Sequence, residues 1–211
     1  MAEPSSELRP YLTAPPVGSG QRVGLFGGSF NPPHLGHVHV SDLALQRLNL
    51  DWIWWLVTPG NPLKDTSDLP PLIDRIRLCE DLTSDPRIRI TAYEAALGAR
   101  YTADTLRQIV SRHPRQNFVW LMGADNLGQF HKWDRWRTIA QTMPIAVIDR
   151  PGSTMQLHAA PAAQALSHNR LDENDAAKLA DQRPPAWVFI HGPRSNLSST
   201  ALRNTQRQNS Q

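Results

Sequence analysis

The sequence predicts an α/β fold in which one mostly parallel sheet is covered by helices on both faces. Short apolar runs alternate along the chain with segments of helical pattern, which is the order expected of strand–helix–strand units. Several of these runs are apolar at consecutive positions instead of alternating between apolar and polar residues. Strands that are covered on both faces have this pattern, whereas strands with one face in water alternate.

The expected elements follow one another from Arg22, where a short apolar run leads into Gly27-Gly28. The later strands are expected at 51–58, 87–91, 117–122, 144–149 and 187–191. The helical segments are expected at 37–48, 72–83, 102–112, 133–142, 159–180 and 199–204. The polar, Ala-rich stretch 154–185 is interpreted as a surface helix or a partly mobile insertion. Parallel sheets bind ligands beyond the carboxyl ends of their strands, so the residues that follow each apolar run are the candidates for chemistry.

The length of 211 residues favours one domain, which is expected to span 22–206. Residues 1–21 are rich in Pro, Ser and Gly and are expected to form a poorly ordered tail, as are residues 207–211. The longest uninterrupted apolar stretch, 52–57, is too short to cross a bilayer, so no membrane partner is expected. The single cysteine cannot form an internal disulfide, which favours a reducing, cytoplasmic compartment.

The charge pattern argues against a nucleic-acid partner. The chain has 22 Lys and Arg against 19 Asp and Glu, and no dense basic run occurs in it. Proteins that bind nucleic acids usually concentrate basic residues on one face or one element. A nucleic-acid-binding module is therefore the least favoured class, and the sequence carries no feature that indicates an oligomeric state.

The most informative segment, 27–37, reads Gly-Gly-Ser-Phe-Asn-Pro-Pro-His-Leu-Gly-His and connects the first strand to a helix. Backbone N–H groups at the start of that helix should point into a cleft and favour an anion. Gly27 and Gly28 permit a close approach of the backbone to a phosphate, which a Cβ would block. His34 and His37 lie three residues apart and share one face of the helix start. Two imidazoles in that position can donate hydrogen bonds to a phosphoryl group, and phosphoryl-type transfer depends mainly on positioning and charge stabilisation.

The alternative interpretation of this segment is a metal site formed by His34, His37 and His39. No cysteine and no second histidine cluster is close in sequence, and His39 should point to another face of the helix. No protein metal site is therefore expected.

The segment 27–37 resembles the H-x-G-H signature of the nucleotidyltransferase superfamily, in the form typical of nicotinate-nucleotide adenylyltransferases. The resemblance implies a Rossmann-like domain, which agrees with the element pattern. It implies that His34 and His37 contact the phosphates of ATP and act in catalysis, with His37 the stronger candidate to stabilise the transition state. It also implies that the ATP site includes Gly27, Gly28, Ser29 and Phe30.

A second motif lies near the C-terminus, where residues 197–203 read Leu-Ser-Ser-Thr-Ala-Leu-Arg. One hydroxyl at a helix start is an ordinary N-cap, but three hydroxyls followed by an arginine one turn later suit a triphosphate, because arginine donates in a fork that matches phosphate oxygens. The stretch resembles the I-S-S-T-x-x-R signature of the same family, with Leu197 in place of Ile. The resemblance implies that Ser199, Thr200 and Arg203 bind the β- and γ-phosphates.

Two middle segments resemble the part of the family that binds the mononucleotide. The resemblance also implies that Ser29, from the segment 27–37, contacts the mononucleotide. Lys64 follows the second strand and either meets a phosphate or is a solvated loop lysine. Thr102 opens a helix, so it either lies beside the pyridine carboxylate, as in the family, or only caps the helix.

A third segment, 122–136, resembles the family in two respects. Gly123 and Asp125 match residues near adenosine, and Trp133 matches the tryptophan that stacks on the nicotinate ring, a flat indole against a flat ring. Alternatively, Trp133 and Trp136 form one apolar face of a helix. The other tryptophans lie within strand runs and are expected to be structural: Trp52, Trp54, Trp55, Trp120 and Trp187.

The resemblance covers about 22–203 and implies adenylyl transfer from ATP to nicotinate mononucleotide, giving nicotinate adenine dinucleotide and pyrophosphate in NAD biosynthesis. The expected partners are these two small molecules. Mg²⁺ is expected to arrive with ATP, held by phosphate oxygens and water more than by a carboxylate cage. The alternatives are a nicotinamide-mononucleotide or pantetheine-phosphate adenylyltransferase and, from a different class, a non-catalytic nucleotide sensor on the same fold. The intact His34, His37 and Arg203 argue against the sensor.

Overall fold

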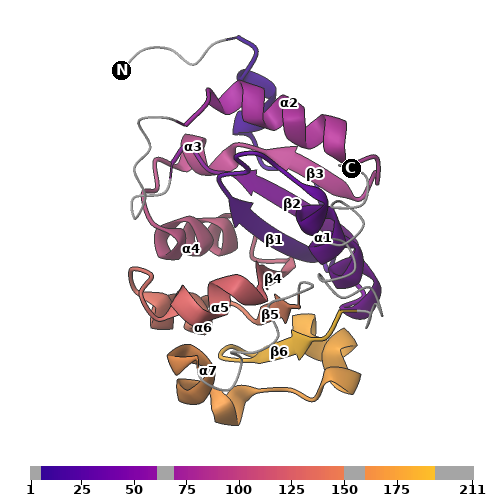
Figure 1. Ribbon diagram of the computed structural model, residues 1–211, viewed down its shortest axis with the longest axis vertical. Helices are drawn as coiled ribbons and strands as arrows, with labels where there is room; N and C mark the ends of the chain where they lie inside the picture. Colours follow the sequence, from indigo (N-terminus) through magenta and orange to yellow (C-terminus); the bar gives the residue numbers. More distant parts are fainter. Residues whose placement is uncertain (1–5, 61–68, 150–159, 193–211) are drawn as a thin grey trace, which may run out of the picture.

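The computed structural model describes residues 6–60, 69–149 and 160–192. A six-stranded sheet in the order β3-β2-β1-β4-β5-β6 crosses the molecule (Figure 1), and its neighbouring strands all pair in parallel. The strands are β1 (Arg22–Gly28), β2 (Trp52–Val57), β3 (Ile88–Thr91), β4 (Asn117–Gly123), β5 (Ile145–Ile148) and β6 (Trp187–Ile190). Each strand agrees with its expected range to within one residue at either end. The strand order 3-2-1-4-5-6 is that of doubly wound Rossmann domains, so the predicted fold class is confirmed.

Helices cover both faces of this sheet. The α-helices are α1 (Leu35–Arg47), α2 (Leu72–Leu82), α3 (Tyr93–Leu97), α4 (Thr102–Arg112), α5 (Ala124–Phe130), α6 (Trp136–Thr142) and α7 (Pro161–Ala165). Three short 3₁₀ helices are η1 (Arg9–Leu12), η3 (Ser167–Asn169) and η4 (Glu173–Asp181). The sequence did not indicate α3 or α5, and the helix expected at 199–204 lies outside the described residues. Within the described parts of the chain, no helix combines the length and apolar character needed to span a membrane.

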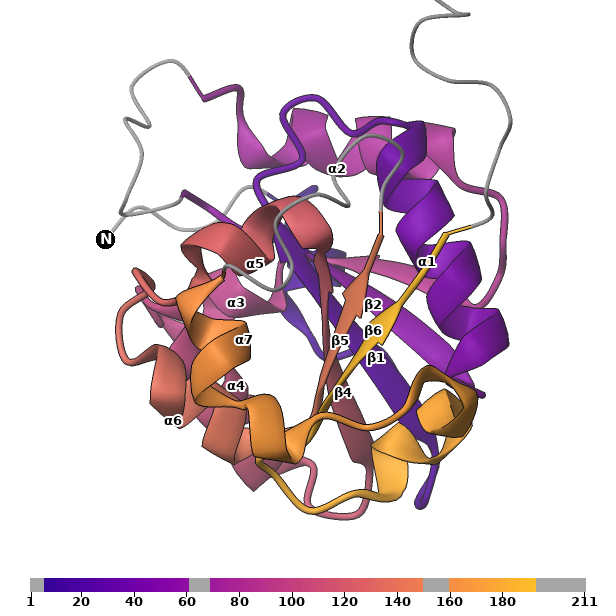
Figure 2. The same cartoon turned by 60° about the horizontal axis from the view of Figure 1, so that its bottom comes forward.

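The sheet separates two hydrophobic cores. One core contains side chains of α3, α4, α5, α6 and α7, and the other contains side chains of α1, α2 and η4. Figure 2 shows α1 on one side of the strands and α5, α6 and α7 on the other. In β2, Trp54 and Leu56 enter the first core, whereas Ile53, Trp55 and Val57 enter the second. Both faces of the strand are therefore buried, which is the physical reason for its consecutive apolar residues.

The long helix expected at 159–180 is wrong, because tertiary hydrogen bonds break it into α7, η3 and η4. The carbonyl of Leu166 accepts a hydrogen bond from the indole Nε1 of Trp187 at 2.8 Å, and Leu171 N donates to Trp187 O at 2.8 Å. These bonds attach the segment to the start of β6, so the backbone groups involved do not continue a helix.

The segment before β1 also differs from the poorly ordered tail expected at 1–21, since residues 6–20 pack on the domain. Tyr11 O accepts hydrogen bonds from Ala92 N and Thr91 Oγ1, both at 2.9 Å, and the Tyr11 hydroxyl donates to Glu80 Oε1 at 2.9 Å. Leu8 and Leu12 pack against the core that contains α1 and α2. A few apolar anchors are enough to order a segment whose overall composition is typical of tails.

A buried hydrogen bond connects α1 to β2. The indole Nε1 of Trp55 donates to Ser41 Oγ at 2.8 Å, and Ser41 Oγ donates to His37 O at 3.0 Å.

We expect Ser41→Ala to lower the free energy of unfolding by about 1–3 kcal/mol, because the buried indole N–H loses its acceptor. Urea denaturation measures this change. Ser111→Ala, which removes an exposed hydroxyl on α4, is the matched control and should stay within about 0.5 kcal/mol of the parent. Equal losses in the two variants would contradict the prediction.

Candidate functional site

A cavity of about 330 Å³ lies beyond the carboxyl ends of β1 and β2, and its walls are completed by residues from α3, α4 and the chain around α5 and α6. After β1 the chain passes to α1, which packs in one core, and after β4 it passes to α5, which packs in the other. The loops that leave these neighbouring strands therefore diverge and open a space between them. This is the switch point at which doubly wound sheets bind ligands, and the volume is within the range of small-molecule sites.

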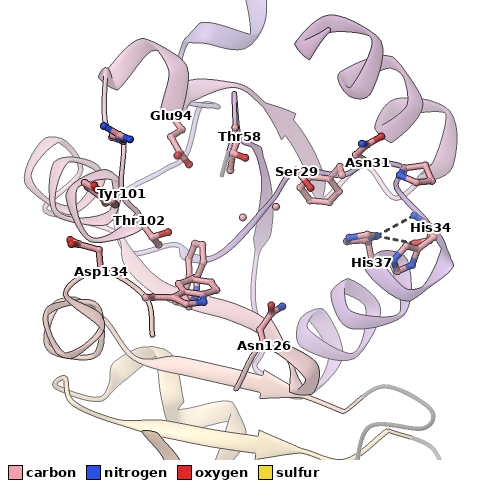
Figure 3. Close-up of a pocket in the computed structure, with 18 residues that line it drawn as sticks. Ser29, Asn31, His34, His37, Thr58, Glu94, Tyr101, Thr102, Asn126 and Asp134 are labelled. Carbon is pink, nitrogen blue, oxygen red and sulfur yellow. Dashed lines mark hydrogen bonds between the residues drawn. The ribbon is translucent and has the colours of Figure 1, made fainter. Parts of the chain in front are cut away.

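His34 and His37 stand at one end of the cavity and are held by the start of α1. His34 is the N-cap residue: its Nδ1 accepts a hydrogen bond from Gly36 N at 3.1 Å, while His37 Nδ1 accepts one from His34 N at 3.1 Å. The ring centroids are 4.0 Å apart, and Figure 3 shows the two rings together beside Asn31. An imidazole whose Nδ1 accepts carries its proton on Nε2. The cap therefore makes the Nε2 of His34 a donor. His37 Nδ1 lies 3.1 Å from His34 N and 3.3 Å from His34 O, so the nitrogen of His37 that carries the proton depends on its tautomer.

The ring of His37 packs against a stack of two aromatic rings, Phe30 and Trp55. Phe30 is 2% exposed, its ring stacks on Trp55 with a centroid separation of 5.0 Å, and its centroid lies 4.7 Å from that of His37. Phe30 has φ of 46°, in the left-handed region that bulky residues rarely adopt. Backbone strain of this kind concentrates at functional sites. Here the left-handed conformation places the Phe30 ring against the imidazole of His37.

The requirement for glycine at position 27 comes from a tryptophan. A Cβ on Gly27 would lie 2.5 Å from the Trp120 ring, and one on Gly28 would lie 3.4 Å from Phe30. The phosphate approach expected of these glycines stays a prediction. Trp120, expected to be mainly structural, also lines the cavity, because the absent side chain of Gly27 leaves room for its ring. Trp120 is 3% exposed, and among the described residues its indole Nε1 has no hydrogen-bond partner.

The opposite end of the cavity contains Thr102, beside Tyr101, and Asp134 (Figure 3). Trp133, which directly precedes Asp134 in the chain, also lines the cavity. Tyr101, not Thr102, is the N-cap residue of α4, and no side chain caps this helix, so Thr102 does not have the capping role. Trp136 is buried in a core, whereas Trp133 is half-buried and lines the cavity. Trp133 precedes α6, which begins at Trp136, so the two tryptophans do not share one helix face, although both pack against Phe130. Trp133 packs edge-on against Trp120, with centroids 6.4 Å apart.

Glu94 is a cavity residue that the sequence reasoning missed. It lies on α3, is 8% exposed, and has no hydrogen-bond partner among the described residues. Burial raises the pKa of its carboxyl group to about 7. An acidic residue inside an apolar run, Ala-Tyr-Glu-Ala-Ala-Leu, is the signal that could have indicated it. Arg100, Asn126 and Asp134 also line the cavity and were not expected to.

Several expected site residues are not among those that line the cavity. Gly123 ends β4 and Asp125 is exposed on α5; the side chain of the next residue, Asn126, faces the cavity instead (Figure 3). The direction of a side chain on the first turn of a helix depends on how that helix leaves its strand. Four other residues lie outside the described ranges: Lys64, Ser199, Thr200 and Arg203. Ser29 lines the cavity, as expected.

No cluster of three or more His, Cys, Asp or Glu side chains that could hold a metal ion occurs among the described residues. His39, the third member of the alternative metal site, has its Nε2 buried without a hydrogen-bond partner in the same part of the chain. It lies near the position of Gly192, where a Cβ would be 3.3 Å from that nitrogen. The three histidines of the H-x-G-H region therefore do not converge on one point.

A doubly wound sheet whose first loop presents two histidines at a helix start, facing a cavity at the switch point, defines a nucleotide-binding domain of the nucleotidyltransferase class. Residues 25–205 match the cytidylyltransferase-like family. The chain is 60% identical over 185 residues to the "Probable nicotinate-nucleotide adenylyltransferase" of Agrobacterium fabrum, covering 88% of this chain and 99% of the relative. It is 61% identical over 184 residues to the protein of the same name from Brucella abortus, covering 87% and 95%.

The chain belongs to the nicotinate-nucleotide adenylyltransferases, within the cytidylyltransferase-like family. Among solved structures, the nicotinic acid mononucleotide adenylyltransferase of Plasmodium falciparum complexed with NaAD aligns with a TM-score of 0.60 and 18% identity, covering 87% of this chain and 83% of that one. At this identity the likeness concerns the fold.

The raised pKa of Glu94 predicts a specific pH dependence of stability. Because the pKa in the folded state lies above the ordinary 4.5, the folded protein holds this proton more tightly than the unfolded chain does. The stabilisation is complete below pH 4.5 and is lost as the pH rises to about 7. Between pH 4.5 and 8, the free energy of unfolding of Glu94→Gln should fall by up to about 3 kcal/mol less than that of the parent protein. Urea denaturation of both proteins between pH 4.5 and 8 measures it; parallel curves would refute it.

Proposed function

We propose that this protein transfers the adenylyl group of ATP to nicotinate mononucleotide, giving nicotinate adenine dinucleotide and pyrophosphate. The observation that carries the proposal is that one cavity has a histidine pair at a helix N-terminus at one end and Trp133 with Thr102 at the other. The first end suits phosphates and the second a flat ring. The names of the relatives from Agrobacterium fabrum and Brucella abortus support the same reaction.

In the proposed reaction, a phosphate oxygen of the mononucleotide attacks the α-phosphorus of ATP. A new P–O bond forms there, the bond to the bridging oxygen between the α- and β-phosphorus breaks, and pyrophosphate leaves. The start of α1 and the ring N–H groups of His34 and His37 donate to oxygens that gain charge in the transition state. No covalent intermediate on the protein is needed, because the two substrates react directly once they are aligned.

The C-terminal hydroxyl–arginine motif is proposed to complete the triphosphate site. Its sequence, 197–203, resembles the family signature, and we assign Ser199, Thr200 and Arg203 to the β- and γ-phosphates on that basis. Gly123 and Asp125 are proposed to lie near adenosine, and Lys64 to meet a phosphate of the mononucleotide. Mg²⁺ would supply charge neutralisation on the triphosphate, carried by phosphate oxygens and water.

The ring end of the cavity is proposed to select the mononucleotide. The half-buried Trp133 presents an indole to the cavity, on which a pyridine ring can stack. Thr102 is the first residue of α4, so backbone N–H groups at this helix start lie close to the place where the ring carboxylate would bind. We also propose a cytoplasmic location, since Cys79 is a free, buried thiol.

One assay tests the proposed function: purified protein with ATP, Mg²⁺ and a panel of nicotinate mononucleotide, nicotinamide mononucleotide and phosphopantetheine, measured by pyrophosphate release. The highest kcat/KM is expected with nicotinate mononucleotide. A higher kcat/KM with either other acceptor would reassign the substrate. Pyrophosphate release with no acceptor would indicate a hydrolase, and no release with any acceptor would indicate a non-catalytic sensor.

His37→Ala is expected to lower kcat by about 10²–10³, the scale for the loss of one preorganised donor to a transition state. Steady-state pyrophosphate release measures kcat and both KM values. The matched control is His168→Ala, an exposed histidine of η3 that does not line the cavity, and its kcat should be unchanged. A normal turnover rate in His37→Ala would remove this residue from the mechanism.

Trp133→Ala should raise KM for nicotinate mononucleotide by about 5- to 150-fold, the range that corresponds to the loss of 1–3 kcal/mol of stacking. The KM for ATP should stay within about two-fold, because the indole belongs to the ring end of the cavity. Trp133→Phe, which keeps an aromatic face, should recover most of the loss. If the two variants have the same KM for the mononucleotide, stacking is not the role of this residue.

A further inference from the structure

Arg75 on α2 is a buried cation whose described partners are backbone carbonyl groups. The residue is 1% exposed and forms no ion pair with the described residues. Its Nε donates to Pro70 O at 3.0 Å, and its Nη1 donates to Ser29 O at 2.6 Å and to Thr58 O at 2.8 Å. Burial lowers the pKa of the guanidinium, but arginine stays charged at neutral pH.

A buried charge without a counter-ion is costly, so its presence requires a reason. Pro70 precedes α2, Ser29 follows β1, and Thr58 follows β2. The guanidinium therefore joins three chain segments that meet at the carboxyl edge of the sheet. Ser29 and Thr58 both line the cavity, as Figure 3 shows, whereas Arg75 does not and lies behind its wall.

The bond to Ser29 O has a direct consequence for the loop that faces the cavity. In a trans peptide unit the carbonyl and the following N–H point in opposite directions. Holding Ser29 O toward Arg75, behind the wall, turns the N–H of Phe30 toward the cavity. Among the described residues this N–H donates to no protein acceptor. It is thus a donor that a bound anion can use.

We propose that Arg75 is a positioning residue for the phosphate end of the cavity, acting on the triphosphate of ATP through Ser29 and Thr58. It holds the two carbonyls so that the N–H of Phe30 faces the phosphates, and it places one positive charge behind the loop that binds them. The proposal rests on the proposed function, since it assigns the polyanion to that end.

The test compares Arg75→Lys with Arg77→Lys, which removes a guanidinium from an exposed position two residues further along the same helix. Lysine keeps the charge but lacks the planar fork that joins three carbonyls. For Arg75→Lys we expect kcat/KM for ATP to fall by about 10- to 100-fold, the scale of a small misplacement of reacting groups. The KM for nicotinate mononucleotide should stay within about two-fold, and Arg77→Lys should match the parent protein in all constants.

Chemical rescue separates positioning from a general structural role. In Arg75→Ala, free guanidinium ion at millimolar concentration should restore kcat/KM for ATP at least several-fold, because it can occupy the site between the three carbonyls. Urea, which has a similar shape and no charge, should not restore it. Arg77→Ala is the control and should not respond to either compound.

Two results would overturn the proposal: a normal kcat/KM for ATP in Arg75→Lys, or equal losses for both substrates with no rescue in Arg75→Ala. If Arg75→Ala does not fold, the result for Arg75→Lys decides alone.

Calorimetric titration with ATP gives a reading that does not depend on the acceptor. Weaker ATP binding in Arg75→Lys supports the proposal even if the parent protein fails to use nicotinate mononucleotide, a failure that would refute the proposed function only.

Discussion

The position of β1 between β2 and β4 determines where this protein can bind a ligand. All three strands run in the same direction, so their carboxyl ends meet at one edge of the sheet. The chain leaves β1 toward one face and β4 toward the other, so the two exits diverge and leave a space between them. His37 and Asn126 reach the cavity because α1 and α5 begin at this gap. The cavity is thus a consequence of sheet topology.

The polar groups of the cavity are arranged at the expense of local stability. Phe30 adopts a left-handed backbone conformation, Arg75 is a buried cation without a described counter-ion, and Glu94 is a buried carboxyl without a described hydrogen bond. Each of these would be unfavourable in a core whose only purpose was stability. They gather around one cavity because the surrounding packed sheet and helices hold them there. Phe30 and Glu94 line the cavity, whereas Arg75 lies behind its wall and is hydrogen-bonded to carbonyl groups. In the proposed function, these groups belong to a cavity with a phosphate end and a ring end.

The ring end combines an apolar surface with directional polar groups. Trp120 and Trp133 are perpendicular to one another, so a ligand ring that stacks on one indole meets the edge of the other. The indole N–H of Trp120 and the carboxyl of Glu94 lack partners among the described residues, and both belong to the cavity wall. In the proposed function, the groups available to select a mononucleotide are therefore more than the stacking tryptophan that the sequence resemblance implied.

What could be predicted from the sequence was encoded in contiguous residues. The strands were predictable because each is buried on both faces and is therefore apolar at consecutive positions, and the histidine pair was predictable because a helix cap is formed within four residues. The cavity contributions of Trp120 and Glu94, and the contacts of Arg75, were not predictable. They depend on the register of β4 against β1, on the short helix α3 and on carbonyls 17 and 46 residues away. Local backbone chemistry is determined by neighbours in sequence, whereas the surroundings of a side chain are determined by the neighbours that folding brings to it.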